Sequence, residues 1–156
     1  MTKKVNARGF TLLEILLVVG IISILAGIVI LAINPTKQLG DTRNAQRRSD
    51  VLTIINAIYQ YTLDEGNNLS DLGIASTTSP TCATDGDDAG NLEADLVTTG
   101  NYLTDIPSDP IDTDESTTTR EYFVVQDSDT DRITVCAPNS IGEGSIVEAT
   151  MISVTR

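Results

Sequence analysis

The chain has 156 residues, which is enough for one small domain, and its formal net charge is −12. It contains no histidine, which excludes His-based catalytic triads, histidine general bases and histidine metal sites. The charge is also segregated, because the segment 64–156 holds 19 acidic residues and three basic ones. A surface of that kind is a poor candidate for general nucleic-acid binding.

The first element is an apolar segment, residues 15–33, which contains no charged residue. As an α-helix it would be about 28 Å long, close to the hydrocarbon thickness of a bilayer. A buried core helix would carry an amphipathic stripe, whereas here every face is apolar, so a membrane span is predicted. Lys3, Lys4 and Arg8 precede the segment and favour a cytoplasmic N-terminus.

A cleaved secretory signal peptide is the alternative, but its apolar core would be shorter and a small-x-small cleavage site would follow. Neither a plain membrane anchor nor a signal peptide accounts for Glu14, a carboxylate near the cytoplasmic end of the span. Such a group costs about 2.5–3.5 kcal/mol at mid-bilayer and less near an interface. An intramembrane carboxylate therefore predicts a functional role and a positively charged partner.

The stretch "RGFTLLEILLVVGIISILAGIVILAI" closely resembles the class III signal of type IV pilins and type II secretion pseudopilins. Gly9, Phe10, Glu14 and the apolar run carry this resemblance at fixed spacing. It implies that a membrane-embedded prepilin peptidase cuts between Gly9 and Phe10 and N-methylates Phe10. It also implies that Glu14, the fifth residue of the mature chain, neutralises the N-terminal amine of a neighbouring subunit in a filament.

This cleavage would remove the basic leader, residues 1–9, and leave the apolar helix in place as the filament core, residues 10–33. We hypothesise that Gly9 is needed because a side chain there would block the cleavage pocket of the peptidase.

An amphipathic continuation, residues 34–65, follows the span. Apolar residues recur in it at helical spacing, at Val51, Ile54, Ile55, Ile58 and then Tyr61 or Thr62. We therefore predict one long helix from about Phe10 to about Leu63, with one face covering a small sheet. The likeliest interruptions are at Gly20, Gly27 and Pro35.

Three bases, Arg43, Arg47 and Arg48, lie just past the span. They are typical of contact with lipid phosphates or of i,i+4 pairing within the helix. A third hypothesis is a set of salt bridges with the acidic head of a neighbouring subunit.

The rest of the chain, residues 66–156, is predicted to form the head. Residues 67–101 are loop-like with a short helix near 91–96, and strands are predicted at 120–126, 132–137 and 146–154. An antiparallel sheet against the helix makes the predicted fold class α+β, the pilin-like "ladle".

Cys82 and Cys136 are the two cysteines, and both follow the apolar span. If that side is extracytoplasmic, a disulfide is permitted there and would tie the irregular loop to a strand. Two buried free thiols are the alternative.

Acid-rich loops suggest calcium, which takes six to eight oxygen ligands. None of them fits an EF-hand. The segment "GNYLTDIPSDP" resembles that of major pseudopilins, which bind calcium after a "DP" pair, so this resemblance points to Asp109, Asp112 and Asp114. Solvated turns are the alternative, and no other cofactor is predicted.

The sequence predicts a structural subunit of a type IV pilus or pilus-like filament, and not an enzyme, because no phosphate loop or nucleophile motif is present. Alternatives are a type II secretion pseudopilin, a low-abundance minor pilin, or a signal-anchored binding protein that does not polymerise. The predicted partners are prepilin peptidase, copies of the same chain, an inner-membrane assembly platform and, before assembly, membrane lipid. The predicted location is the inner membrane before assembly, and the cell surface or periplasm afterwards.

Overall fold

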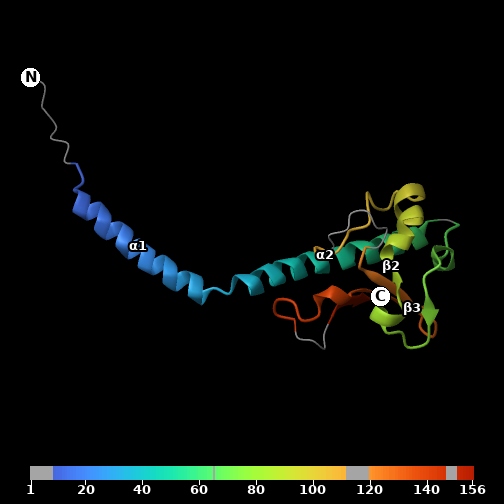
Figure 1. Cartoon of the computed structure of the whole chain (residues 1–156). Coiled ribbons are helices and arrows are strands. Elements are labelled where there is room, and N and C mark those ends of the chain that lie inside the picture. The colour runs from blue at the N-terminus through green and yellow to red at the C-terminus, as the bar shows by residue number, and fades with distance from the viewer. Residues whose placement is uncertain (1–8, 65, 112–119, 147–150) are drawn as a thin grey trace, which may run out of the picture. The chain divides into compact units, whose positions relative to one another are not determined.

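The computed structural model describes residues 9–64, 66–111, 120–146 and 151–156. The chain divides into two compact units, Met1–Pro35 and Thr36–Arg156. Figure 1 colours the chain from the N-terminus to the C-terminus, and the helix α1 (Leu12–Ala32) belongs to the first unit. The helix α2 (Pro35–Leu63) begins at the last residue of that unit, and every later element belongs to the second.

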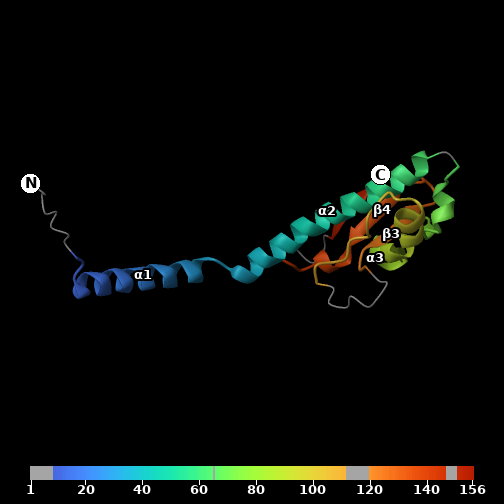
Figure 2. The same ribbon diagram turned by 90° about the horizontal axis from the view of Figure 1, so that it is seen from above.

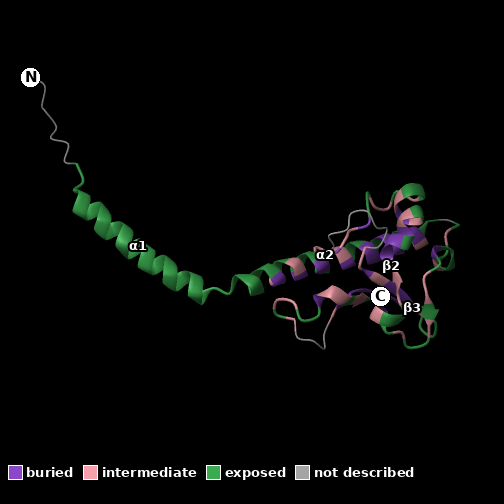
Figure 3. Cartoon of the chain, viewed as in Figure 1, coloured by how far each residue is buried: buried purple, intermediate pink, exposed green. Residues whose placement is uncertain are grey.

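Helix α1 has 21 residues and would be about 31 Å long, enough to cross the hydrocarbon core of a bilayer. None of its residues is buried, and it is coloured as exposed along its whole length in Figure 3. Within this helix, the Ser23 hydroxyl donates a hydrogen bond to the Val19 backbone carbonyl oxygen at 2.8 Å. By length and composition α1 is a candidate membrane span, as predicted.

The long helix predicted from about Phe10 to about Leu63 is divided into two helices, and the break lies at Pro35, one of the three predicted interruptions. Helix α1 ends at Ala32 and α2 begins at Pro35, while Ile33 is extended with φ −95° and ψ 120°. Proline explains both ends, because it disfavours helical backbone in the residue before it and suits the first position of a new helix. Helix α1 continues without a break through Gly20 and Gly27, the other two predicted interruptions.

Helix α2 packs one face against the sheet of the head, and both views show it lying along that sheet (Figures 1 and 2). The residues predicted for this face are buried: Val51, Ile54, Ile55, Ile58 and Tyr61. The opposite face is exposed (Figure 3). The helical period of apolar residues thus identified the packing face correctly.

Among the described residues the sheet has five strands, in the order β1-β3-β4-β5, with β2 also paired to β3. The strands are β1 (Ser76–Thr77), β2 (Asp87–Asp88), β3 (Phe123–Asp127), β4 (Ile133–Ala137) and β5 (Ile152–Thr155). Strands β3, β4 and β5 form antiparallel pairs as predicted, but β1 pairs with β3 in parallel. The sheet is therefore mixed, not wholly antiparallel.

Short helical turns occupy the connections. They are η1 (Leu69–Leu72), α3 (Cys82–Asp85), η2 (Ala89–Leu92), the π-helical η3 (Ala94–Thr99) and η4 (Pro138–Ser140). Turns η2 and η3 lie where a short helix near 91–96 was predicted. Of the third predicted strand, 146–154, residues 147–150 lie outside the described residues, and β5 covers most of the rest.

The sheet separates two apolar clusters, since consecutive strand residues point to opposite faces. Val124 and Val135 pack with α2 in the main core, whereas Val125 and Cys136 pack on the other face with Cys82. The observed architecture is thus an apolar N-terminal helix, a second helix and a small mixed sheet, which is the predicted α+β pilin-like fold.

Candidate functional site

The predicted cleavage site lies in exposed, non-helical backbone. Gly9 and Phe10 precede α1, which begins two residues after Phe10, and the Phe10 side chain is 79% exposed. Exposed chain outside regular structure is where proteases act most readily. A Cβ added at Gly9 would meet nothing within 4 Å. The packing of the described residues therefore does not require a glycine at this position.

Glu14 lies in the first turn of α1, at the end of a Thr-x-x-Glu spacing. Thr11 is the N-cap, and its hydroxyl oxygen accepts a hydrogen bond from the Glu14 backbone N–H at 3.2 Å. A carboxylate in a first turn also interacts with the positive end of the helix dipole, worth about 0.3–1 kcal/mol. The T-x-x-E capping signal is visible in the sequence, although the predictions made from it did not include a cap at Thr11.

That local stabilisation is smaller than the cost of a charge inside an apolar medium, about 2.5–3.5 kcal/mol at its deepest. Capping alone therefore does not compensate for Glu14, and a further positive partner is still expected.

Residues 4–30 match the model of the prokaryotic N-terminal methylation motif. The chain carries the class III signal of type IV pilins and pseudopilins. The match includes Gly9, Phe10 and Glu14, and the signal implies processing by prepilin peptidase. Together with the apolar helix α1 it fits a membrane-anchored, pilin-like precursor. Comparison with curated proteins found no match, and comparison with solved structures found none either.

In the head, the side chain of Arg47 on α2 is fully buried. Its Nε donates to Asp109 Oδ2 at 2.7 Å and its Nη2 to Asp109 Oδ1 at 2.8 Å, a bidentate ion pair. Its Nη1 donates to Asn44 Oδ1 at 2.9 Å and also to the Glu143 carboxylate. Burial, the largest single effect, lowers the pKa of Arg47, but the bonds and charges of the two carboxylates outweigh it and hold the pKa above its ordinary value.

Glu143 extends this network along α2. Its carboxylate accepts from Arg43 Nε as well as from Arg47, and its backbone carbonyl accepts from Asn44 Nδ2 at 2.8 Å. Two separate loops, one through Asp109 and one through Glu143, are thereby attached to one helix face.

The three bases of this cluster have different surroundings, and contact with lipid phosphates or with a neighbouring subunit stays a prediction. Within the described residues, Arg43 and Arg47 form their ion pairs with acids of their own head, and Arg47 also donates to Asn44 one turn earlier on α2. Arg48 alone of the three is exposed and has no salt bridge within the described residues.

Beside this network, Tyr122 donates its hydroxyl hydrogen to Asp50 Oδ2 at 2.8 Å. Burial, together with the nearby negative charge of Asp109, raises the pKa of Asp50 although the tyrosine bond opposes this. Burial and the bond to Asp50 likewise raise the pKa of Tyr122.

The calcium prediction named Asp109, Asp112 and Asp114. Both carboxylate oxygens of Asp109 accept from Arg47, and Oδ1 also accepts from the Ile111 backbone N–H at 3.0 Å. Asp112 and Asp114 lie outside the described residues. Calcium at this loop stays a prediction, and it would have to share Asp109 with a buried arginine.

The carboxylates of the other acid-rich loops accept hydrogen bonds from the backbone, some within a turn and some from distant segments. Backbone N–H groups donate to Asp85, Asp87, Asp88 and Asp127. Asp88 alone accepts from three of them, those of Gly90, Arg120 and Glu121. Among the described residues, no cluster of three acidic or cysteine side chains could hold a metal ion.

Cys82 and Cys136 form a disulfide in the structure, with their Cα atoms 6.2 Å apart. The bond joins the turn α3 to the strand β4 on the sheet face opposite α2. It therefore attaches the long connection between α2 and β3 to the centre of the sheet.

Proposed function

We propose that the chain is a structural subunit of a type IV pilus or a closely related filament. Prepilin peptidase would cut between Gly9 and Phe10 and methylate Phe10, and the mature chain would polymerise through α1. The observation that carries this proposal is the methylation motif at residues 4–30, placed on an apolar helix with no buried residue.

The exposure of α1 supports polymerisation. An apolar surface that extends over a whole helix of 21 residues needs a nonaqueous environment. Lipid supplies it before assembly, and the α1 helices of neighbouring subunits supply it afterwards, as the filament core.

Glu14 supports the same proposal. Cleavage creates an amine at Phe10, and this amine is positively charged in its ordinary state. Two opposite charges in an apolar core are each costly alone and much less so when paired. The amine of one subunit would therefore neutralise the Glu14 of its neighbour and set the register between them.

Two related functions remain as alternatives within this proposal, a type II secretion pseudopilin and a low-abundance minor pilin. A signal-anchored binding protein that never polymerises is less well supported, because it would leave Glu14 without a partner. We propose no enzymatic activity and no cofactor other than the calcium predicted above. The proposed partners are prepilin peptidase, copies of the chain, an inner-membrane assembly platform and lipid.

In location, the precursor would span the inner membrane once with its N-terminus in the cytoplasm, and the filament would lie at the cell surface or in the periplasm.

The test uses the full chain in cells that assemble it. Glu14→Ala should leave membrane insertion and cleavage after Gly9 unchanged, as measured by mass spectrometry of the N-terminus, and should abolish filaments recovered by shearing. Thr11→Ala is the matched control, because it removes the N-cap hydroxyl and keeps the carboxylate.

If the loss came from a weakened helix start, both variants would fail alike. Normal filaments from Glu14→Ala, or equal loss in Thr11→Ala, would contradict the amine-pairing role. A wild-type chain that stays in the membrane and never enters a filament would contradict the proposed function as a whole.

A further inference from the structure

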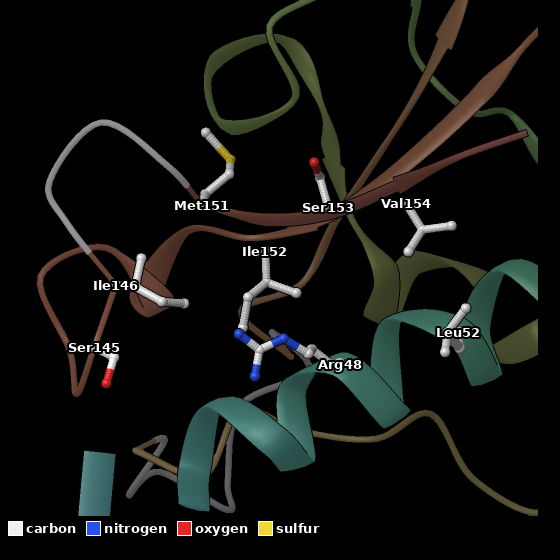
Figure 4. Close-up of a pocket in the computed structure, with 8 residues that line it drawn as sticks. All are labelled: Arg48, Leu52, Ser145, Ile146, Met151, Ile152, Ser153 and Val154. Atoms are coloured by element: carbon white, nitrogen blue, oxygen red, sulfur yellow. The ribbon is translucent and has the colours of Figure 1, made fainter. Parts of the chain in front are cut away.

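An open groove of about 520 Å³ lies between α2 and β5 in the head. Arg48 and Leu52 line it from α2, and Met151, Ile152 and Val154 line it from the opposite side. Figure 4 shows the Arg48 guanidinium extending from the helix toward Ile152, with Leu52 further along the same helix. The walls are thus mainly apolar, with one cation among them.

Hydrogen bonds on either side of the groove join α2 to the opposite wall. At one end the Ser145 backbone N–H donates to Asp41 Oδ1 at 2.7 Å, and at the other Arg156 Nη1 donates to Asn56 Oδ1 at 2.8 Å. Strand β5 is also the last strand in the sheet order, so among the described strands nothing pairs with its outer edge. The groove is therefore bounded by α2 and β5, and one side of it is open among the described residues.

Arg48 differs from its neighbours on α2. Arg43 and Arg47 are held by carboxylates of the same head, whereas the Arg48 side chain forms no hydrogen bond and no salt bridge within the described residues. The Arg48 guanidinium, which lies among apolar groove walls, is therefore complementary to a small protein segment that carries an exposed carboxylate.

The same chain presents such a surface, the hairpin between β3 and β4, residues 127–132. It holds three acids, and Ser128–Asp131 is exposed at its tip. Asp127 accepts from a backbone N–H and Asp131 from Gln126 Nε2, but no hydrogen bond to the Asp129 carboxylate forms within the described residues. Asp129 is therefore the hairpin acid best able to pair with an outside cation.

Within one head this hairpin cannot enter the groove. The β4–β5 register pairs Ile133 with Arg156, which is the residue that closes the far end of the groove on α2. The hairpin begins beyond that closure. A second copy of the chain has no such restriction.

We propose that the groove between α2 and β5 receives the β3–β4 hairpin of a second copy, with Arg48 paired to Asp129. The groove and the hairpin are different surfaces, so the contact is heterologous and repeats from copy to copy, whereas a self-complementary contact would close a dimer. The inference rests on the proposed function, because a polymer is where such a repeating contact is used.

Charge reversal tests the pair in the full chain. Arg48→Glu should reduce the sheared filament yield about fivefold or more, and the double variant Arg48→Glu with Asp129→Arg should restore at least half of it. Arg48→Glu with Asp85→Arg has the same net charge and should not restore the yield, since Asp85 lies outside the hairpin. Because Arg48 is exposed, the unfolding midpoint of the head should stay unchanged in Arg48→Glu.

Cysteine cross-linking tests the contact directly. When Leu52→Cys and Asp129→Cys chains are made together, oxidation should give disulfide dimers in wild-type-like filaments and none when Glu14→Ala is added. Dimers from Leu52→Cys chains alone would mean a symmetric contact and would overturn the hairpin assignment. Filaments without the mixed cross-link, or full yield from Arg48→Glu, would overturn the contact while the filament role stands. Absence of any Glu14-dependent filament would overturn both.

Discussion

Replacement of Asp109 by asparagine should destabilise the head strongly. The side chains of Arg47 and Asp109 both have zero exposure, and the pair is bidentate. Removal of one partner from a buried ion pair costs about 3–5 kcal/mol, because the other charge stays buried without compensation. Here Glu143 remains as a second acceptor and is itself 14% exposed, so we expect a loss near 3 kcal/mol, at the low end of that range.

The structure predicts a different result when both charges are removed together. In Arg47→Met with Asp109→Leu no unpaired charge is left behind, and apolar replacements of buried pairs are often neutral or stabilising. The double variant should therefore be more stable than Asp109→Asn by about 2 kcal/mol or more. Arg48→Met, one residue further along α2 and exposed, is the matched control and should change the free energy of unfolding by less than about 0.5 kcal/mol.

The assay is guanidinium unfolding of the full, disulfide-intact chain in detergent micelles. The chain has four tyrosines and no tryptophan, so near-ultraviolet circular dichroism reports the head through its tyrosines. A loss of about 3 kcal/mol would also lower the thermal midpoint by roughly 10 °C. A loss below about 1 kcal/mol for Asp109→Asn, or a double variant no more stable than the single one, would refute the assignment of Arg47 as a buried, carboxylate-dependent cation.

Three further outcomes follow from the same geometry. Gly40→Ala should destabilise the head by about 1–3 kcal/mol, because its Cβ would lie 2.5 Å from the Gly144 nitrogen; unchanged thermal unfolding would contradict that close approach. Cys136→Ser should cost about 4 kcal/mol by loop closure with Cys82, and reductant should lower the stability of the wild type alone. The pKa of Asp50 is raised above its ordinary value of 3.8, so the native state holds that proton more tightly and the stability from this group is lost as pH rises through the raised pKa. The difference in unfolding free energy, wild type minus Asp50→Asn, should therefore be larger at pH 3 than at pH 7, and the opposite slope would show that the pKa is not raised.

The parts of the fold that depend on local pattern could be predicted from the sequence. Apolar runs and helical spacing indicated α1 and the packing face of α2, and alternation with turn residues indicated β3 and β4. Strands β1 and β2 could not be predicted, because each has only two residues and exists only through pairing with β3. Such short strands depend on distant partners and not on their own composition.

The buried face of α2 begins before the first apolar residue from which it was predicted, and Arg47 belongs to this earlier part. The residues of α2 that face the head are Gly40, Asn44, Arg47, Val51, Ile54 and others at the same three- and four-residue spacing. The face therefore continues toward the N-terminus through residues that a hydrophobic period does not count. Extension of the stripe by helical geometry alone would have placed Arg47 inside and Arg48 about 100° away from it.

A buried arginine requires carboxylate partners, and an acidic head can provide them from loops that no local pattern links to the helix. Which acids these are, Asp109 and Glu143, depends on the path of the chain over more than sixty residues and could not have been read from spacing. The same geometry leaves Arg48 outside the stripe. Two adjacent arginines of equal charge thus have different surroundings, since Arg47 joins the head to its own helix while Arg48 is exposed and forms no salt bridge within the described residues.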